Sequence, residues 1–135
     1  MVNKKLLHPQ EVETFYVLPT LRRYLAKYMK EAGMKQKDVA ELLMVNTATL
    51  SQYASSKRGH QINFEGNILD EIKKSASIID SKLTYFRETQ RLLKLIRSTN
   101  ALCAVHRQVS FVPAGCSPTG VGCTNEDSQI VLLDL

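Results

Sequence analysis

The chain has 135 residues, a length that supports one domain with a substantial core. Its 18 Lys and Arg residues outnumber its 13 Asp and Glu residues, which gives a formal net charge of +5. No run of about eighteen apolar residues occurs, and no apolar segment of signal-peptide length follows the N-terminal lysines. We therefore expect a cytoplasmic protein with no membrane partner.

The positive charge is concentrated in the first part of the chain. Residues 1–60 hold ten Lys or Arg against five Asp or Glu, whereas residues 101–135 hold one against three. A polyanionic partner would require such a local excess of positive charge. Ordinary solubility is the alternative explanation, because many soluble proteins are modestly basic.

The first predicted helices lie on either side of Pro19. Residues 10–15 are predicted to form a short helical turn, and residues 20–32 a helix that ends at Gly33. Apolar side chains recur on this helix at helical spacing. Off the apolar stripe, a basic face that could meet a DNA backbone or simply be solvated comprises Arg22, Arg23, Lys27 and Lys30.

The segment of residues 36–58 reads QKDVAELLMVNTATLSQYASSKR and predicts two short helices joined by a tight turn. The first helix spans residues 36–43 and the second residues 47–54, with Asn46 as the N-cap of the second. Ala40 is small where the two backbones approach, and the shared apolar seam comprises Val39, Leu43, Val45 and Leu50. The outer face of the second helix is then small and polar, as a major groove requires, and comprises Thr47, Ala48, Thr49, Ser51, Gln52 and Ser55. Within this face we expect base contacts chiefly from Thr47, Thr49 and Gln52.

This segment resembles the helix-turn-helix of the lambda-repressor/Cro-like (Xre-type) regulators. The resemblance implies an all-α, lambda-repressor-like bundle that binds double-stranded DNA, with a phosphate contact from Gln36. Lys57 and Arg58 follow the second helix and are placed for further phosphate contacts. The chain departs from the family at the turn, where Met44 stands in place of the usual Gly. A helical hairpin without a DNA role is the alternative.

Residues 67–97 are predicted to be helical with a break at residues 80–81. The part at residues 67–79 would close the bundle through Ile68, Ile72, Ala76 and Ile79. The part at residues 82–98 is an extra amphipathic helix, whose predicted apolar stripe comprises Leu83, Phe86, Leu92, Leu93 and Ile96. We expect this helix to form a homodimer that matches two-fold operators, or else to pack back on its own domain.

This organisation divides the chain into a DNA-binding domain at residues 1–80 and a second region at residues 81–135. The second region combines the dimerisation helix with a short, irregular segment that contains all three cysteines. Cys103 and His106 are one turn apart on a helix predicted at residues 99–108, and Cys116 and Cys123 lie on a loop that could fold back toward them. Three thiolates and an imidazole could bind zinc or hold an iron–sulfur cluster.

The cysteine-containing segment also resembles the C-terminal region of a group of archaeal Xre-type regulators, through the run Leu102-Cys103-Ala104-Val105-His106. That resemblance implies metal, iron–sulfur or redox sensing. The chain departs from the group because Leu92 or Leu93 occupies the place of an earlier cysteine, and because six residues separate Cys116 from Cys123. A redox-active thiol pair, and small buried thiols without a cofactor, are the alternatives.

The sequence as a whole predicts a sequence-specific transcriptional regulator rather than an enzyme. No Ser/His/Asp arrangement, paired carboxylates or phosphate-binding Gly loop is present, and no small-molecule substrate is evident. Cys103 and His106 could in principle act as nucleophile and base, but one helical turn between them on the same helix does not favour a productive geometry. The competing function is a non-enzymatic protein-interaction module, antitoxin-like or adaptor-like, that uses the same helical scaffold. The two differ in whether the chain binds duplex DNA with a steep dependence on salt.

Overall fold

The computed structural model describes residues 5–55, 62–64 and 66–116, and these residues contain helices and no β-strand. The helices are α1 (Pro9–Val12), α2 (Leu18–Glu31), α3 (Gln36–Leu43), α4 (Thr47–Ala54), α5 (Asn67–Ile78), α6 (Lys82–Ser98) and α7 (Ala101–Val109). A π-helical segment, Glu13–Val17, joins α1 to α2. The all-α prediction is confirmed for this part of the chain, in which no helix is both long and apolar enough to cross a bilayer.

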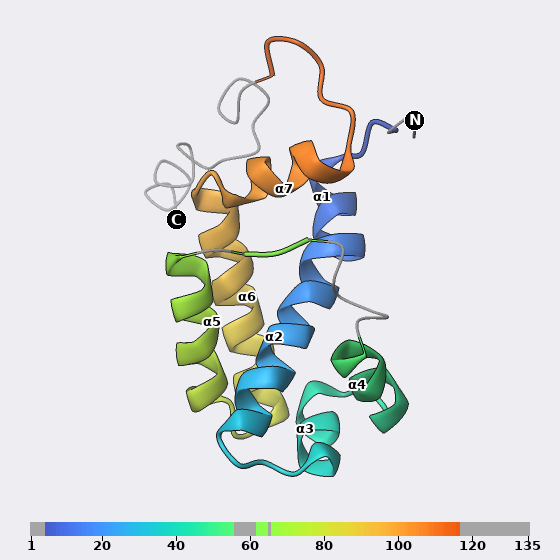
Figure 1. The fold of residues 1–135 in the computed structure, drawn as a ribbon. Coiled ribbons are helices and arrows are strands. Elements are labelled where there is room, and N and C mark those ends of the chain that lie inside the picture. Colours follow the sequence, from blue (N-terminus) through green and yellow to red (C-terminus); the bar gives the residue numbers. More distant parts are fainter. Residues whose placement is uncertain (1–4, 56–61, 65, 117–135) are drawn as a thin grey trace.

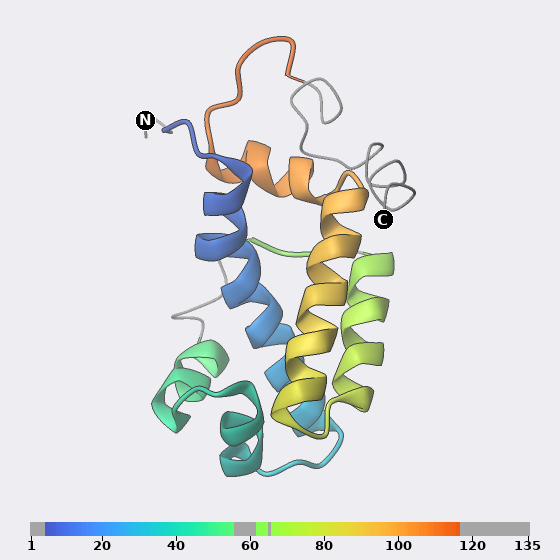
Figure 2. The ribbon, with the colours of Figure 1, turned by 180° about the vertical axis from the view of Figure 1, so that it is seen from behind.

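Helix α2 is the central element of the bundle (Figure 1). Helices α5 and α6 lie along one side of it, α3 and α4 lie at one end, and α7 crosses the opposite end. Helix α5 packs directly against α2, and α6 packs against α5 on the side seen from behind (Figure 2). All of these helices except α1 contribute at least two side chains to a single buried cluster, in which Leu25 of α2, Ile72 of α5 and Ile96 of α6 are fully buried.

The chain is helical without a break from Pro9 to Glu31, although Pro19 lies inside this stretch. An α-helical register would bring the Pro19 ring against the carbonyl four residues earlier. The π-helical segment changes the register just before the proline, so that the Leu18 N–H donates to the carbonyl of Glu13. The Tyr16 carbonyl accepts a hydrogen bond from Thr20 Oγ1 at 2.7 Å. The predicted separation into residues 10–15 and 20–32 is therefore wrong, because the π turn accommodates Pro19.

Helices α5 and α6 lie close to the predicted spans, but α6 buries a different face from the one we predicted. Leu92 and Ile96 are fully buried, whereas Leu83 is 70% and Phe86 62% exposed. The apolar stripe is thus wrong for its first two members. One turn before Leu92, the inward positions are held instead by Glu88 and Thr89, which are both buried.

Glu88 can be buried because polar groups of α5 and α6 satisfy it. Its Oε1 accepts hydrogen bonds from Ser75 Oγ at 2.8 Å and from Arg91 Nε at 3.0 Å. Arg91 also donates to Glu71 Oε1 at 2.6 Å, so the network joins the two helices. The turn between α5 and α6 coincides with the predicted boundary at residue 80, although side chains from both sides of it share one core.

Candidate nucleic-acid interface

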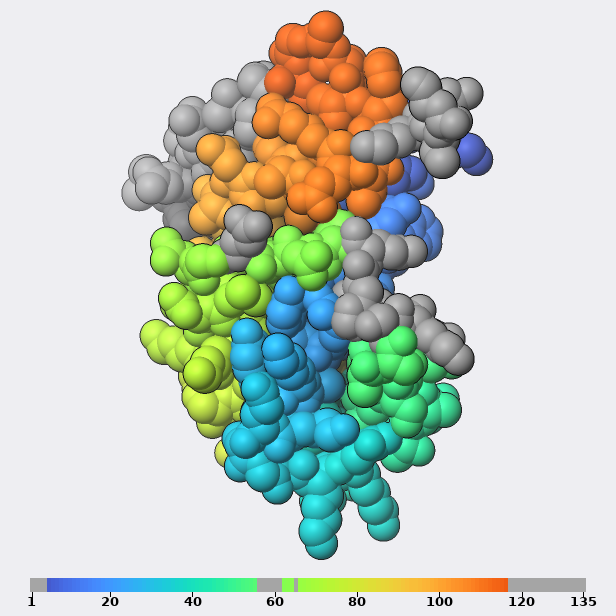
Figure 3. Space-filling view, in the orientation of Figure 1, coloured from blue at the N-terminus to red at the C-terminus, as the bar shows by residue number. Residues whose placement is uncertain are grey.

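Helices α3 and α4 have the bounds that we predicted for them, residues 36–43 and 47–54. Three side chains of the predicted seam, Val39, Leu43 and Leu50, are at most 3% exposed, and Val45 is half-buried. Ala40 is 5% exposed between the helices, where a small residue was expected. The pair forms one end of the molecule, beside α2, and its surface is open to solvent in Figure 3.

Asn46 caps α4 as predicted. Its Oδ1 accepts hydrogen bonds from the Thr49 backbone N–H at 2.7 Å and from Thr49 Oγ1 at 2.8 Å. The cap satisfies one of the N–H groups that the first helical turn leaves without a partner. It also fixes the Thr49 hydroxyl close to the backbone, where that hydroxyl is less available to a base edge.

The turn before α4 keeps the geometry that favours glycine, although a methionine occupies it. Met44 has φ 59° and ψ 39°, in the left-handed region. Its N–H donates to the Glu41 carbonyl at 3.2 Å, and the Val45 N–H donates to the Ala40 carbonyl at 3.0 Å. The Met44 side chain is 68% exposed, so little packing compensates for the backbone strain.

The outward face of α4 exposes four of the six side chains predicted to face a groove, but only one of the three predicted base contacts. Leu50 and Tyr53 are its buried residues. The exposed members of the predicted set are Thr47, Ala48, Ser51 and Ser55, whereas Thr49 and Gln52 are half-buried. Gln52 Oε1 is buried and has no hydrogen-bond partner among the residues that the structure describes. Thr47, Ala48 and Ser51 are therefore the side chains best exposed to a groove.

Gln36 links the first turns of the two helices. Its Nε2 donates to the Thr47 carbonyl and to Ser51 Oγ, both at 3.2 Å, and its Oε1 accepts from Lys30 Nζ at 3.4 Å. The amide thus holds α4 against α3 and orients a lysine of α2. No side-chain cap covers the start of α3, where Lys35 is the N-cap residue.

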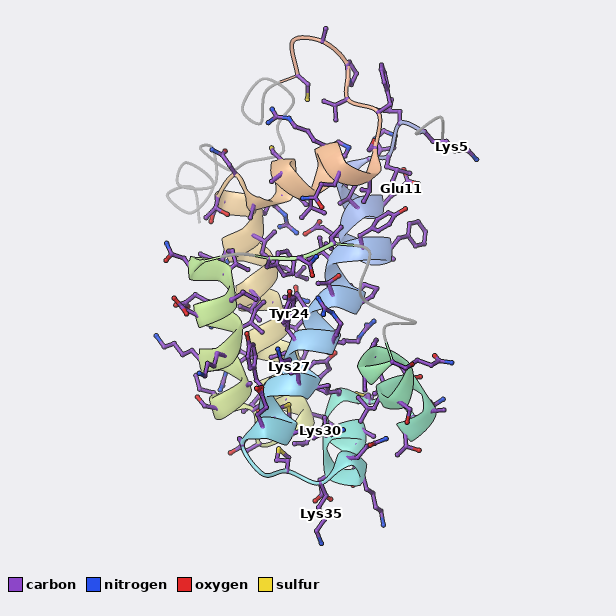
Figure 4. All side chains as sticks on the ribbon, in the orientation of Figure 1. Lys5, Glu11, Tyr24, Lys27, Lys30 and Lys35 are labelled. Atoms are coloured by element: carbon purple, nitrogen blue, oxygen red, sulfur yellow. The ribbon has the colours of Figure 1, made fainter. Side chains whose placement is uncertain are left out.

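Exposed lysines surround Gln36. Figure 4 shows Lys27 and Lys30 following one another along α2, and Lys35 at the start of α3. Lys35 and Lys37 stand on either side of Gln36 and are exposed. Sequence reasoning missed them, although their position beside Gln36 was a sufficient signal.

The two arginines of the predicted basic face are engaged within the protein. Arg22 Nε donates to the hydroxyl of Tyr85 at 3.3 Å, and Arg23 donates to Asn63 Oδ1 at 3.1 Å. The Arg23 guanidinium also lies 4.2 Å from the centre of the Tyr24 ring. The exposed part of the basic face is therefore its lysines, Lys27 and Lys30. Lys57 and Arg58 lie outside the described residues.

The structure describes three of the four predicted metal ligands. His106 is buried, and its Nε2 lies 2.7 Å from the Leu7 carbonyl, to which it donates because a carbonyl oxygen only accepts. Only Nδ1 then remains for an ion. Burial raises the pKa of the half-buried Cys103 thiol; Arg107 lowers it and Cys116 raises it, and the net shift is upward. The thiol form, which does not bind metal, is thereby favoured.

Within the described part of the chain, no group of three or more His, Cys, Asp or Glu side chains is placed to hold a metal ion. Cys123, the fourth predicted ligand, lies outside that part. The described residues therefore do not fit zinc or an iron–sulfur cluster by themselves, and the metal site stays a prediction.

No protein-family model, curated protein or solved structure matches this chain.

Proposed function

We propose that the chain is a sequence-specific DNA-binding transcriptional regulator that inserts α4 into the major groove of duplex DNA. The observation that supports this most strongly is the outward face of α4, where Thr47, Ala48 and Ser51 are exposed. These side chains are small enough for the helix backbone to approach base edges, and the Thr47 hydroxyl can hydrogen-bond there. The Ser51 hydroxyl already donates to the Thr47 carbonyl and accepts from Gln36, both at 3.2 Å. A capped start and a buried Leu50 hold that face in place.

The start of α3 supplies the phosphate contacts in this proposal. Its first backbone N–H groups have no side-chain cap, and a helix N-terminus favours an anion. Lys30, Lys35 and Lys37 add positive charge around that point. Phosphate contacts of this kind fix the register of α4 on the duplex without reading its sequence.

A homodimer completes the proposal. One short recognition helix reads only a few base pairs, whereas two copies related by a two-fold axis read two half-sites about 34 Å apart. Such an arrangement raises both affinity and specificity.

A protein-interaction module is the second candidate function, and a different observation favours it. Leu83 and Phe86 are large apolar side chains, one turn apart on α6, that are each more than 60% exposed. Exposed apolar side chains that lie close together mark protein-binding surfaces. A module of this kind would bind duplex DNA neither tightly nor with a steep salt dependence.

Selection from a pool of random duplexes tests the proposal. The purified chain should enrich one sequence motif, and its affinity for random duplex should fall steeply with salt. Ala48→Glu places a carboxylate on the exposed face of α4, facing the DNA, and should weaken binding about tenfold or more. The matched control is Ala104→Glu, because Ala104 is an exposed alanine of α7, at the far end of the bundle.

The two variants decide between the candidate functions. Equal affinity of Ala48→Glu and Ala104→Glu for the selected duplex would show that α4 does not enter the groove. Failure to enrich any motif, with flat salt dependence, would favour the interaction module.

A further inference from the structure

The solvent-facing side of α6 has two halves with different chemistry. Exposed positions recur along it at the three- and four-residue spacing of one helix face, at residues 83, 86, 87, 90 and 94. The N-terminal half presents Leu83 and Phe86, which are 70% and 62% exposed. The following turns present Arg87 and Lys94, which are also exposed. An apolar patch is thus followed along the helix by a cationic one.

Both halves lack a partner within the part of the chain that the structure describes. Arg91 pairs with Glu71 and Glu88, and Arg97 pairs with Glu13, so these two arginines are neutralised. Arg87 and Lys94 make no ion pair with a described residue. A hollow of about 440 Å³ follows this face and is lined, among the described residues, by Arg87, Gln90, Arg91, Leu93, Lys94 and Arg97.

The chain itself contains a segment with the complementary chemistry. Residues 117–135, which lie outside the described part, contain three acidic residues and no Lys or Arg. The acidic pair Glu126-Asp127 comes first, and the apolar run Ile130-Val131-Leu132-Leu133 follows. Such a run gains free energy when it leaves water. The acid-then-apolar order matches α6 when that helix is followed from its C-terminal end to its N-terminal end.

We propose that residues 126–133 bind along the outward face of α6 in the same chain, antiparallel to the helix. Glu126 and Asp127 then lie beside Lys94, and the apolar run covers Leu83 and Phe86. Opposite charges thus meet at one end of the segment, and apolar side chains meet at the other.

The separation between the charged and the apolar residues is similar on α6 and in residues 126–133. Lys94 is about ten residues from the Leu83–Phe86 pair, which is about 15 Å along a helix. The acidic pair is about five residues from the middle of the apolar run, which is about 17 Å in an extended chain. The two patterns therefore match between Lys94 and the apolar pair, whereas Arg87, one residue after Phe86, lies next to the apolar run.

The segment is also long enough to reach this face. Cys116 follows α7, and α7 begins three residues after Ser98, the last residue of α6. The ten residues from Cys116 to Glu126 span up to about 33 Å, more than the 26 Å or so of the whole of α6. A second copy of the chain is thus not needed to supply the segment.

Photo-crosslinking from Phe86 tests this contact in the full-length chain. In the test variant, the photoreactive residue p-benzoylphenylalanine replaces Phe86. In the matched control variant it replaces Phe15, which is 59% exposed on the π-helical segment. Mixing ¹⁵N-labelled and unlabelled chains separates links within one copy from links between copies. We expect links from position 86 to residues 128–135 of the same copy, and no such links from position 15.

Charge reversal supplies a second measurement. Arg87→Glu with Lys94→Glu, or Glu126→Lys with Asp127→Lys, should lower the yield of the link about fivefold at low salt. The four substitutions together should restore it. Links between copies that rise with concentration would show that a second copy occupies the face, which overturns the proposal. A yield from position 86 no higher than from position 15 overturns it as well. Neither result depends on whether the chain binds DNA.

Discussion

Met44 offers a test of the turn that orients α4, independent of any ligand. A left-handed backbone conformation costs an L-residue roughly 1–2 kcal/mol, because its Cβ crowds the following carbonyl oxygen. Glycine avoids this cost, but its greater flexibility in the unfolded chain lowers the free energy of unfolding by about 0.4–1 kcal/mol. Because Met44 is 68% exposed, its side chain contributes little packing that the substitution would lose. Met44→Gly should therefore raise the free energy of unfolding by about 0.5–1 kcal/mol.

Urea unfolding followed by circular dichroism measures this difference, and Met44→Ala is the matched control. Alanine removes the same side chain but keeps the Cβ, so Met44→Ala should remain close to the wild type and below Met44→Gly. A change in the urea midpoint at constant slope identifies a change in stability rather than in the unfolded state. If Met44→Gly is no more stable than Met44→Ala, residue 44 is not a strained left-handed residue, and the backbone conformation assigned to the turn before α4 is wrong.

Two further predictions concern the residues that hold the helices in place. Asn46→Ala removes the acceptor for the Thr49 N–H and should lower the free energy of unfolding by about 0.5–2 kcal/mol, whereas Asn46→Asp keeps the cap and should not, as thermal unfolding can show. Burial raises the pKa of Glu88, but hydrogen bonds from Ser75 and Arg91 lower it more, so it lies below its ordinary value of 4.5. A carboxyl with a depressed pKa in the folded state stabilises the protein above pH 4.5, and this stability is lost as the pH falls through the lower, folded-state pKa. Glu88→Gln should flatten that acid dependence in urea unfolding curves measured from neutral to acidic pH, and an unchanged slope with pH would refute the role of Glu88.

Local sequence signals were sufficient for the α3–α4 pair. The N-cap Asn46, the small Ala40 and the apolar seam each act within a few residues of the chain, so the sequence alone predicts both helices and their shared contact. The same holds for α5, whose four predicted apolar residues are all buried. These features depend on helix geometry that neighbouring residues impose on one another.

Features that depend on distant partners could not be predicted in this way. Glu88 is an inward residue of α6 only because Ser75 of α5 and the neighbouring Arg91 satisfy its carboxylate. An apolar pattern therefore favoured Leu83 and Phe86, which lie on the opposite side of the helix. The arginines of α2 were misjudged for the same reason, since the tyrosine and the asparagine that they contact come from segments about 60 and 40 residues away, respectively.

The hydrogen bonds of Gln36 change which side chain is available to bind a phosphate. A glutamine amide nitrogen carries two N–H groups, and both are directed at acceptors of α4, the Thr47 carbonyl and Ser51 Oγ. A phosphate oxygen accepts hydrogen bonds but donates none, so it could engage Gln36 only at the expense of one of these bonds. Lys30 has three N–H groups and directs one of them at Gln36 Oε1. Gln36 therefore orients α4 and Lys30 within the protein. If the chain binds DNA as proposed, Lys30 and the uncapped start of α3 would be the donors available to a phosphate, and Gln36 would not.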